Sequence, residues 1–383
     1  GEHTLHLDIK PENVIVNGKG QAKVADFGLA ALMDATGSGT TGGGAIGYMP
    51  LEQMRRMLQN LQPQFATGDR VNLAFQGGEP TLAGLQWFRS FTDITEQWDA
   101  GIEVTYALQT NATTLDEDWC RYLAEKKYLV GVSLDLLPQC HDDARVDASG
   151  NGTFQRCLHA VELLNAFHVE YNILCTLTRQ IAKHPRQVWQ TLKQYDIRYV
   201  QFTPCLDTLE HPGGNPYALT PRRFSQFYNQ LFPLWLSDYQ KGNYRSVKLF
   251  DDVINLMAYG IPTACGIHGR CQPQLVVEAD GNVYPCDFYC LDEYRVGNIL
   301  DNSLEEILSA GRLSPVQKRE PLPKLCGSCP YLAFCGGGCK RMQREIACTD
   351  RDSVCGYREF LNAAGADMQQ IAAQLRHRGY AGA

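Results

Sequence analysis

Ten of the fifteen cysteines in this 383-residue chain fall within one stretch of 91 residues, from Cys265 to Cys355. The densest part, CGSCPYLAFCGGGC, runs from Cys326 to Cys339. A stretch with short loops and so many thiols is typical of a small domain stapled by metal. The spacing alone fits two structures, a zinc ribbon built from C-x2-C pairs and an iron–sulfur domain.

The remaining cysteines lie in apolar segments, and we interpret them as ordinary small core residues. They are Cys120, Cys140, Cys157, Cys175 and Cys205. The sequence contains neither a signal peptide nor a run of about 18 apolar residues, so we expect a cytoplasmic protein that does not enter a membrane. Thiols in that compartment serve metal or cluster ligation more than disulfides. A formal net charge of −7 without a basic stripe excludes a general nucleic-acid binder.

Residues 50 to about 245 alternate between short apolar runs and amphipathic stretches. The apolar runs are VNLAFQ (71–76), IEVTYALQT (102–110), LVGVSLD (129–135), VEYNILCT (169–176) and IRYVQFT (197–203). Helical patterns separate them at 82–98, 116–127 and 153–168. This alternation predicts an α/β fold with a parallel sheet, open or curled into a barrel. Ligands then gather where the strands end, at QGGEP, QTN, SLD and TPCLD.

The first 48 residues follow another pattern. HLDIKPENVIV, VADFGLA and GTTGGGAIGYMPLEQ resemble, in this order, the catalytic loop, the DFG motif and the activation segment of a Ser/Thr protein kinase. The resemblance implies a kinase-like remnant in which Asp8 orients the substrate hydroxyl, Lys10 faces phosphate, and magnesium is held by Asn13 and Asp26. The family's glycine-rich loop and strand lysine are absent from this sequence, so we expect neither ATP binding nor kinase activity.

The segment FQGGEPTLAGLQWF (75–88) follows the first apolar run. Taken alone, its Gly-Gly-Glu-Pro is either a tight, helix-capping turn or a loop in which Glu79 meets the ammonium group of a small ligand. Followed by ALQTNAT, GVSLD, DDARVDASGNGTF and QFTPCLD, it closely resembles the anaerobic sulfatase-maturating enzymes. These are radical S-adenosylmethionine (SAM) proteins with a SPASM domain.

This second resemblance covers residues from about 49 to 383. It implies a partial (β/α)6 radical SAM barrel over 49–245, which we expect to lack its first strand, and a cysteine-rich SPASM auxiliary-cluster domain over 246–383. Residues 1–48 remain a truncated kinase-like fragment. The two resemblances meet near GYMPLEQ, where the two families have similar sequences. A join at this point suggests a recombined or mis-assembled gene.

The resemblance also assigns residues to a SAM site. Gly77, Gly78 and Glu79 would bind the methionine amino end of the cofactor. Ser133 and Arg145 match positions that contact its ribose and carboxylate.

Further positions follow from the same alignment of motifs. Leu206 matches an apolar neighbour of the adenine, and Gln109 and Asn111 match positions near the substrate peptide. Asp287 matches the general base, which takes the thiol or hydroxyl proton of the target residue; the alternative is that it caps a turn. The sequence departs from the family at Leu136, where a glycine is usual.

By resemblance, the cysteines hold two auxiliary [4Fe–4S] clusters with four thiolates each. One cluster takes Cys265, Cys271, Cys286 and Cys339. The second takes Cys326, Cys329, Cys335 and Cys355. Cys348 is a possible substitute for the last ligand, and Cys290 is spare. Next to the GGEP series, this assignment is preferred to a zinc ribbon.

The implied reaction oxidises an active-site Cys or Ser of a sulfatase to Cα-formylglycine, with SAM as cofactor and an electron donor such as flavodoxin or ferredoxin. The radical-generating cluster of that family needs a C-x3-C-x2-C motif, but residues 1–119 contain no cysteine. We therefore expect this chain to be inactive as written. Two other hypotheses are a non-catalytic iron–sulfur protein that binds peptides or transfers electrons, and a kinase-derived regulator.

Overall fold

The computed structural model describes residues 2–5, 16–17, 49–209, 213–319, 321–347 and 354–380. The kinase-like positions Asp8, Lys10, Asn13 and Asp26 lie outside the described residues, as does Cys348, so their assignments stay predictions. Two compact units interleave along the chain. The first contains residues 1–131, 160–170 and 273–318, and the second contains residues 132–159, 171–272 and 319–383. The predicted domain boundaries at 48 and 245 also stay predictions.

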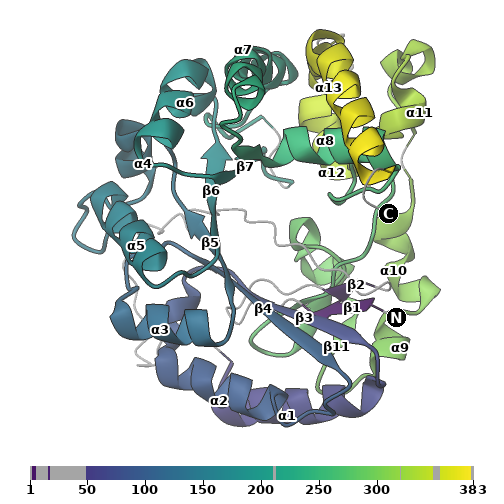
Figure 1. Cartoon of the computed structure of the whole chain (residues 1–383). Helices are drawn as coiled ribbons and strands as arrows, with labels where there is room; N and C mark the ends of the chain where they lie inside the picture. Colours follow the sequence, from purple (N-terminus) through teal and green to yellow (C-terminus); the bar gives the residue numbers. More distant parts are fainter. Residues whose placement is uncertain are drawn as a thin grey trace. The chain divides into compact units, whose positions relative to one another are not determined.

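The first unit is built on parallel strands (Figure 1). Strand β3 (Arg70–Phe75) pairs in parallel with β4 (Glu103–Thr110) and with β1 (Glu2–Leu5), and β2 (Val16–Asn17) adds to β1 in antiparallel fashion. Helices α1 (Leu51–Leu61), α2 (Leu85–Thr95) and α3 (Glu117–Glu125) alternate with these strands along the chain. Strand β5 (Leu129–Ser133) begins in this unit and ends in the second.

The edge of β3 differs from the expectation that the barrel lacks its first strand. Residues of the kinase-like segment occupy this edge, with Glu2 opposite Arg70 and Thr4 opposite Asn72. An unpaired strand edge exposes a row of backbone donors and acceptors, and pairing with β1 satisfies them. The sequence around β1 did not indicate a barrel strand. Pairing between strands uses backbone groups, so it requires no particular side-chain pattern.

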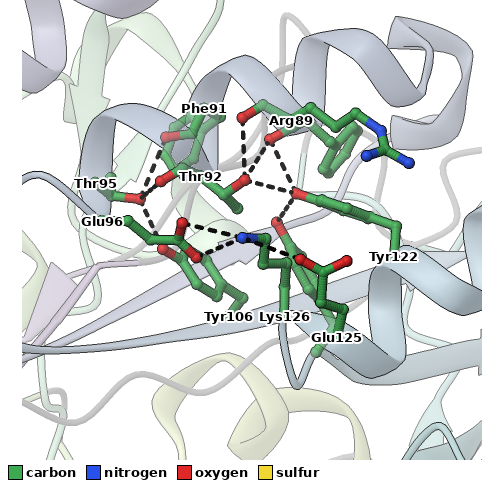
Figure 2. A network of polar contacts seen from close by, with 11 residues as sticks. Arg89, Phe91, Thr92, Thr95, Glu96, Tyr106, Tyr122, Glu125 and Lys126 are labelled. Atoms are coloured by element: carbon green, nitrogen blue, oxygen red, sulfur yellow. Dashed lines mark hydrogen bonds and ion pairs between the residues drawn. The ribbon is translucent and has the colours of Figure 1, made fainter.

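Aromatic packing holds the helices of the first unit on the sheet. The Phe75 ring of β3 lies 4.9 Å from Phe88 and 5.0 Å from Phe91, both on α2. Figure 2 shows the polar layer beside this core, where the hydroxyl groups of Thr95 and Tyr106 lie 2.6 Å apart. The same layer includes an ion pair of 2.7 Å between Lys126 and Glu96. Buried hydroxyls thus find partners, as a low-dielectric interior requires.

A small antiparallel sheet also belongs to the first unit. It contains β9 (Val276–Val277), β10 (Asn282–Tyr284) and β11 (Gly297–Asn298), followed by α9 (Leu304–Ile307) and α10 (Ala310–Gln317). Helix α1 anchors it, because Gln53 donates to the Ala279 carbonyl at 2.8 Å and Asn60 donates to the Leu300 carbonyl at 3.0 Å.

The second unit repeats the parallel strand–helix pattern. Strands β6 (Tyr171–Leu177), β7 (Tyr199–Pro204) and β8 (Ser246–Val247) pair in parallel. Its helices include α4 (Pro138–Ala144), α6 (Pro185–Gln194), α7 (Pro221–Gln240), α8 (Lys248–Tyr259) and α13 (Gly356–Tyr380), while α5 (Phe154–Ala166) has residues in both units. Rings of Tyr228, Phe250 and Phe360 join α7, α8 and α13 in one core.

The cysteine-rich part of the second unit has only short elements. They are a 3-10 helix at Lys324–Ser328, α11 (Leu332–Cys335), α12 (Lys340–Met342) and a π-helical segment at Gln343–Ala347. Across the part of the chain that the structure describes, no helix is both long and apolar enough to cross a membrane.

Candidate functional site

The Gly-Gly-Glu segment follows the end of β3 and takes a backbone shape that requires glycine. Gly77 has a φ of 93° and Gly78 a φ of 49°, both in the left-handed region that side chains disfavour. This turn ends at Glu79, which is the N-cap of a 3-10 helix, Pro80–Ala83. The capping role of Glu79 is therefore observed, while its contact with the ammonium group of a ligand stays a prediction.

Four donors surround the buried Glu79 carboxylate. Its Oε1 accepts from the Thr81 N–H (3.1 Å), the Thr81 hydroxyl (2.5 Å) and the Thr110 hydroxyl (2.6 Å). Its Oε2 accepts from the Asn111 N–H at 2.7 Å. Three donors thus crowd one oxygen and a single donor meets the other, so Oε2 keeps capacity for a further donor.

Burial raises the pKa of Glu79 above its ordinary value, and the hydroxyl and N–H donors of Thr110, Thr81 and Asn111 oppose that rise. Glu79 is 5% exposed. A buried carboxylate is costly unless it is hydrogen-bonded or paired with a cation. The arrangement fits an ammonium group, which would supply both positive charge and donors.

Two glutamines at neighbouring strand ends carry buried amides without partners. Both side-chain amide atoms of Gln76, and Oε1 of Gln109, are buried and have no hydrogen-bond partner within the described part of the chain. They follow the register pair Phe75 and Leu108 of β3 and β4. Such orphaned atoms indicate a missing ligand, because buried polar groups are otherwise satisfied. The family resemblance named Gln109, whereas Gln76 entered the sequence analysis as the first residue of the strand-end segment QGGEP and without a role of its own.

The Asn111 side chain is turned to its own loop. Its Oδ1 accepts from the N–H and the hydroxyl of Thr113, at 2.9 and 2.8 Å. Its backbone N–H serves Glu79. These contacts therefore tie the main chain of Asn111 to the candidate site. The sequence analysis had placed Asn111 near the substrate peptide, and that assignment stays a prediction.

In the second unit, Arg145 is held by an acidic clamp. Its Nε donates to Asp135 Oδ2 at 2.7 Å and its Nη2 donates to the Thr176 hydroxyl at 3.3 Å. Asp135 Oδ1 in turn accepts from the Thr176 N–H at 2.8 Å. Asp135 follows the end of β5, two residues after the buried Ser133. The clamp fixes the orientation of the guanidinium, a group whose planar set of donors suits a carboxylate.

A buried imidazole stands behind this clamp. His141 Nδ1 accepts from the Asp135 N–H at 3.1 Å, so the proton lies on Nε2, which is 3.1 Å from the Thr153 hydroxyl. Burial lowers the pKa of His141 to about 4. The ring is therefore neutral near pH 7 and acts as a structural acceptor.

Leu206 lies buried in a loop that is tied to the segment after Cys339. The next residue, Asp207, donates its N–H to Glu345 at 2.5 Å, and Arg341 bonds both Glu345 and the Asp207 carbonyl. Arg341 is itself buried. This loop is thus fixed by charged contacts to the π-helical segment.

The thiols assigned to the second cluster lie near one another in the second unit. Burial is the main reason that the pKa of Cys355 is raised to about 11, and the thiols of Cys335 and Cys326 add to the rise. Burial likewise raises the pKa of Cys335, with Cys329 and Cys326 contributing. All four are therefore close enough to interact electrostatically. Cys355 precedes α13 directly, as expected for the closing ligand.

No three His, Cys, Asp or Glu side chains gather tightly enough to hold a single metal ion within the ranges described. That finding is compatible with the thiol group just described, because a [4Fe–4S] cluster binds one thiolate at each of four irons and spreads them wider than one tetrahedral ion does. The donor set, four cysteines, fits such a cluster.

Cysteines of the first predicted cluster fall in both units. In the second unit, a Cβ placed on Gly266 would lie 2.6 Å from Cys339 Cβ, so the residue after Cys265 must be a glycine for the two segments to pack this closely. The Cys265 thiol points to the carbonyl of Gln272, the neighbour of Cys271.

In the first unit, Asp287 lies beside the remaining thiol of that set. Its Oδ1 accepts from the Cys286 thiol at 3.2 Å and from the Phe288 N–H at 3.0 Å. The Phe288 contact suits the turn-capping interpretation of Asp287, and its role as the general base stays a prediction. The spare thiol, Cys290, donates to the Cys286 carbonyl at 3.6 Å.

Comparison with known families defines the class. An iron–sulfur cluster-binding SPASM domain matches residues 265–330, and a protein kinase domain matches residues 1–64. With the parallel strand–helix pattern and a Gly-Gly-Glu segment at a strand end, these features define a radical SAM protein with a SPASM domain and a kinase-like N-terminal segment.

Individual relatives narrow the class. The cysteine-type anaerobic sulfatase-maturating enzyme of Clostridium novyi (strain NT) is 38% identical over 275 residues, 70% of this chain and 72% of the relative. That of Clostridium perfringens (strain ATCC 13124) is 36% identical over 338 residues, 87% of this chain and 91% of the relative. The solved structure of native anSMEcpe with bound AdoMet and Cp18Cys peptide has a TM-score of 0.78 at 33% identity, covering 86% of this chain and 92% of that one. The chain belongs to the anaerobic sulfatase-maturating enzyme family.

Proposed function

We propose that this chain carries the SAM-binding, peptide-binding and auxiliary-cluster parts of a sulfatase-maturating enzyme, which oxidises an active-site Cys or Ser of a sulfatase to Cα-formylglycine. The observation that carries the proposal is the Glu79 carboxylate, buried at the end of β3, where Oε1 accepts three donors and Oε2 accepts one from the residues that the structure describes. Both amide atoms of Gln76 and Oε1 of Gln109, which have no partner among the described residues, lie at the ends of β3 and β4 and suit the polar main chain of a peptide.

Each residue has a defined task in this proposal. Glu79 holds the ammonium of SAM through a charge-assisted hydrogen bond, and Arg145, oriented by Asp135, holds its carboxylate. Bound with its reducing cluster, SAM supplies the radical that removes a hydrogen atom from Cβ of the target residue. Asp287 takes the thiol or hydroxyl proton of that residue, a role that suits a carboxylate beside a cluster ligand. The two four-cysteine sets would hold the auxiliary clusters, which would take up the electron released from the target residue, and a donor such as flavodoxin or ferredoxin would supply the electron that reduces SAM.

Binding of SAM tests the proposal. Equilibrium dialysis of the anaerobically reconstituted chain with radiolabelled SAM should show saturable binding, and Glu79→Gln should weaken it roughly ten- to hundredfold, the size of a lost charge-assisted hydrogen bond. Glu103→Gln is the matched control, because Glu103 forms an exposed ion pair with Arg70 at the other end of β4. Equal affinity in both variants would contradict the proposed site.

The sequence favours a second candidate function on one observation. No C-x3-C-x2-C motif occurs among the 383 residues, so this sequence contains no recognisable ligand set for the radical-generating cluster. The second candidate is a protein that binds a sulfatase peptide without converting it. A Cys-containing sulfatase peptide, chosen because both clostridial relatives are cysteine-type, would then bind without release of 5′-deoxyadenosine. Detection of 5′-deoxyadenosine by mass spectrometry would exclude this candidate.

A further inference from the structure

Thr110, the last residue of β4, joins the two strand-end turns of the first unit. Its hydroxyl donates to Glu79 Oε1 at 2.6 Å and accepts from the Ala112 N–H at 2.9 Å. Thr110 is 1% exposed, so water does not offer an alternative partner. One side chain thus links the Gly-Gly-Glu turn after β3 to the Asn111–Ala112 turn after β4.

The turn after β4 has an unusual backbone. Ala112 has a φ of 59°, in the left-handed region that an alanine disfavours, and it is buried. Its N–H is taken by the Thr110 hydroxyl, and this conformation leaves the preceding Asn111 N–H directed at Glu79 Oε2. Strained backbone of this kind persists only where the surroundings fix it.

The two turns together divide the donors unequally between the carboxylate oxygens. Oε1 receives the Thr110 hydroxyl and both donors of Thr81, whereas the Asn111 N–H is the one donor to Oε2 among the residues that the structure describes. The remaining capacity of Oε2 is where a cation would bind. The Thr81 hydroxyl is itself in contact with that of Thr114, so a second residue after β4 supports the same arrangement.

We infer that Thr110 is a positioning residue for the SAM ammonium group, which it serves by fixing the Glu79 carboxylate with Oε2 turned to the ligand. This inference rests on the proposed function. It is independent of the iron–sulfur clusters, because the contacts that carry it involve no cysteine. The Thr110 hydroxyl does not touch the ligand itself; it acts through Glu79.

A pH effect distinguishes positioning from simple packing. All hydrogen-bond partners of Glu79 within the described ranges are neutral hydroxyl or N–H groups, and burial raises its pKa against them. Loss of the Thr110 donor raises that pKa further. Below the new pKa the carboxyl is protonated and cannot pair with an ammonium, so binding weakens as the pH falls and recovers as it rises.

The first experiment measures SAM affinity by equilibrium dialysis at several pH values between about 5.5 and 7.5, below the range in which an α-amino group loses its proton. Thr110→Val keeps the shape and removes the hydroxyl, and we expect about a tenfold loss of affinity at the acid end that shrinks toward neutral pH. Thr110→Ser restores a hydroxyl and should lie within about threefold of the parent chain. Thr92→Val, which removes a buried hydroxyl from α2, is the matched control.

A second experiment needs no ligand. A 13C NMR titration of glutamate-labelled protein, with the Glu79 signal assigned by its absence in Glu79→Gln, should give a higher carboxyl pKa in Thr110→Val than in the parent chain. An unchanged pKa and an unchanged pH profile of binding would overturn the inference. If the parent chain binds no SAM, the proposed function fails, and the titration alone then decides whether Thr110 positions Glu79.

Discussion

The strand ends and the cysteine-rich segment of this protein are ordered by different means. At the ends of β3, β4 and β5, side chains such as Glu79 and Asp135 are buried and bonded to threonine hydroxyls, backbone N–H groups and an arginine. Between residues 324 and 347, the helices have only three to five residues. Four cysteine thiols lie in this segment, and they are buried or half-buried. Hydrogen bonds set the shape of the strand ends. The shape of the cysteine-rich segment depends on what its thiols bind.

Because of this difference, we assign ligand binding to the strand ends and redox chemistry to the cysteine-rich segment. Hydrogen-bonded strand ends are organised without cofactor, so the contacts that orient Glu79 in the first unit, and those that orient Arg145 in the second, are in place before any ligand binds. Elements as short as α11 and α12 cannot bury enough apolar surface to stand alone, so cluster formation and local folding are one event there. We therefore expect that damage to one region leaves the signature of the other intact.

Replacing a cluster cysteine should have the largest effect. Cys335→Ser removes one thiolate of a four-cysteine site, so we expect about four of roughly eight irons to be lost after anaerobic reconstitution. Hydrogen exchange should rise around α11 and α12 while β3 and β4 stay protected. Cys120→Ala, at a buried thiol in α3, is the control and should keep its iron. Full iron content in Cys335→Ser would remove that residue from the ligand set.

Asp135→Asn should give the converse result. The substitution keeps the shape but leaves Arg145, 22% exposed, without its carboxylate partner. We expect a loss of about 3 kcal/mol in the free energy of unfolding by urea, with unchanged iron content. Asp147→Asn, in an exposed loop, keeps an acceptor oxygen for the Ser149 N–H and should leave the free energy of unfolding close to that of the parent chain. Loss of iron in Asp135→Asn would show that the two regions are not independent.

His141 predicts a smaller, pH-dependent effect. Its pKa is about 4 in the folded chain against about 6.5 in the unfolded chain, so the unfolded state binds the extra proton between these values. Stability therefore falls as the pH drops below about 6.5, by roughly 2 kcal/mol at pH 5. Urea unfolding at several pH values measures this slope, which should flatten in His141→Gln. The exposed His159 provides the control, and a slope retained in His141→Gln would refute the assignment.

The strands could be predicted from the sequence because their signal is local. The apolar runs at 71–76, 102–110 and 129–135 correspond to β3, β4 and β5 to within one residue at the start and two residues at the end of each. The helical pattern at 82–98 became a 3-10 turn followed by α2, since Gly84, with a φ of 86°, interrupts it. Glycine spacing and the thiol pattern are local signals too, and they indicate the correct family.

Other parts of the site had no local signal. The roles of Gln76, Asp135 and His141 depend on which strand ends meet in space, and nothing in their neighbours along the chain reveals it. Thr110 is one of several threonines in a polar loop until its hydroxyl is seen on Glu79. Strand β1 was hidden for another reason, because its contribution is backbone pairing inside a segment whose side chains resemble a kinase.

Iron and zinc counted per chain after anaerobic reconstitution test the central claim most directly. Two four-cysteine sites predict about eight irons and no zinc, with the absorption of [4Fe–4S] clusters. Zinc in place of iron would contradict the account, because it would return the thiols to zinc-ribbon sites without redox chemistry.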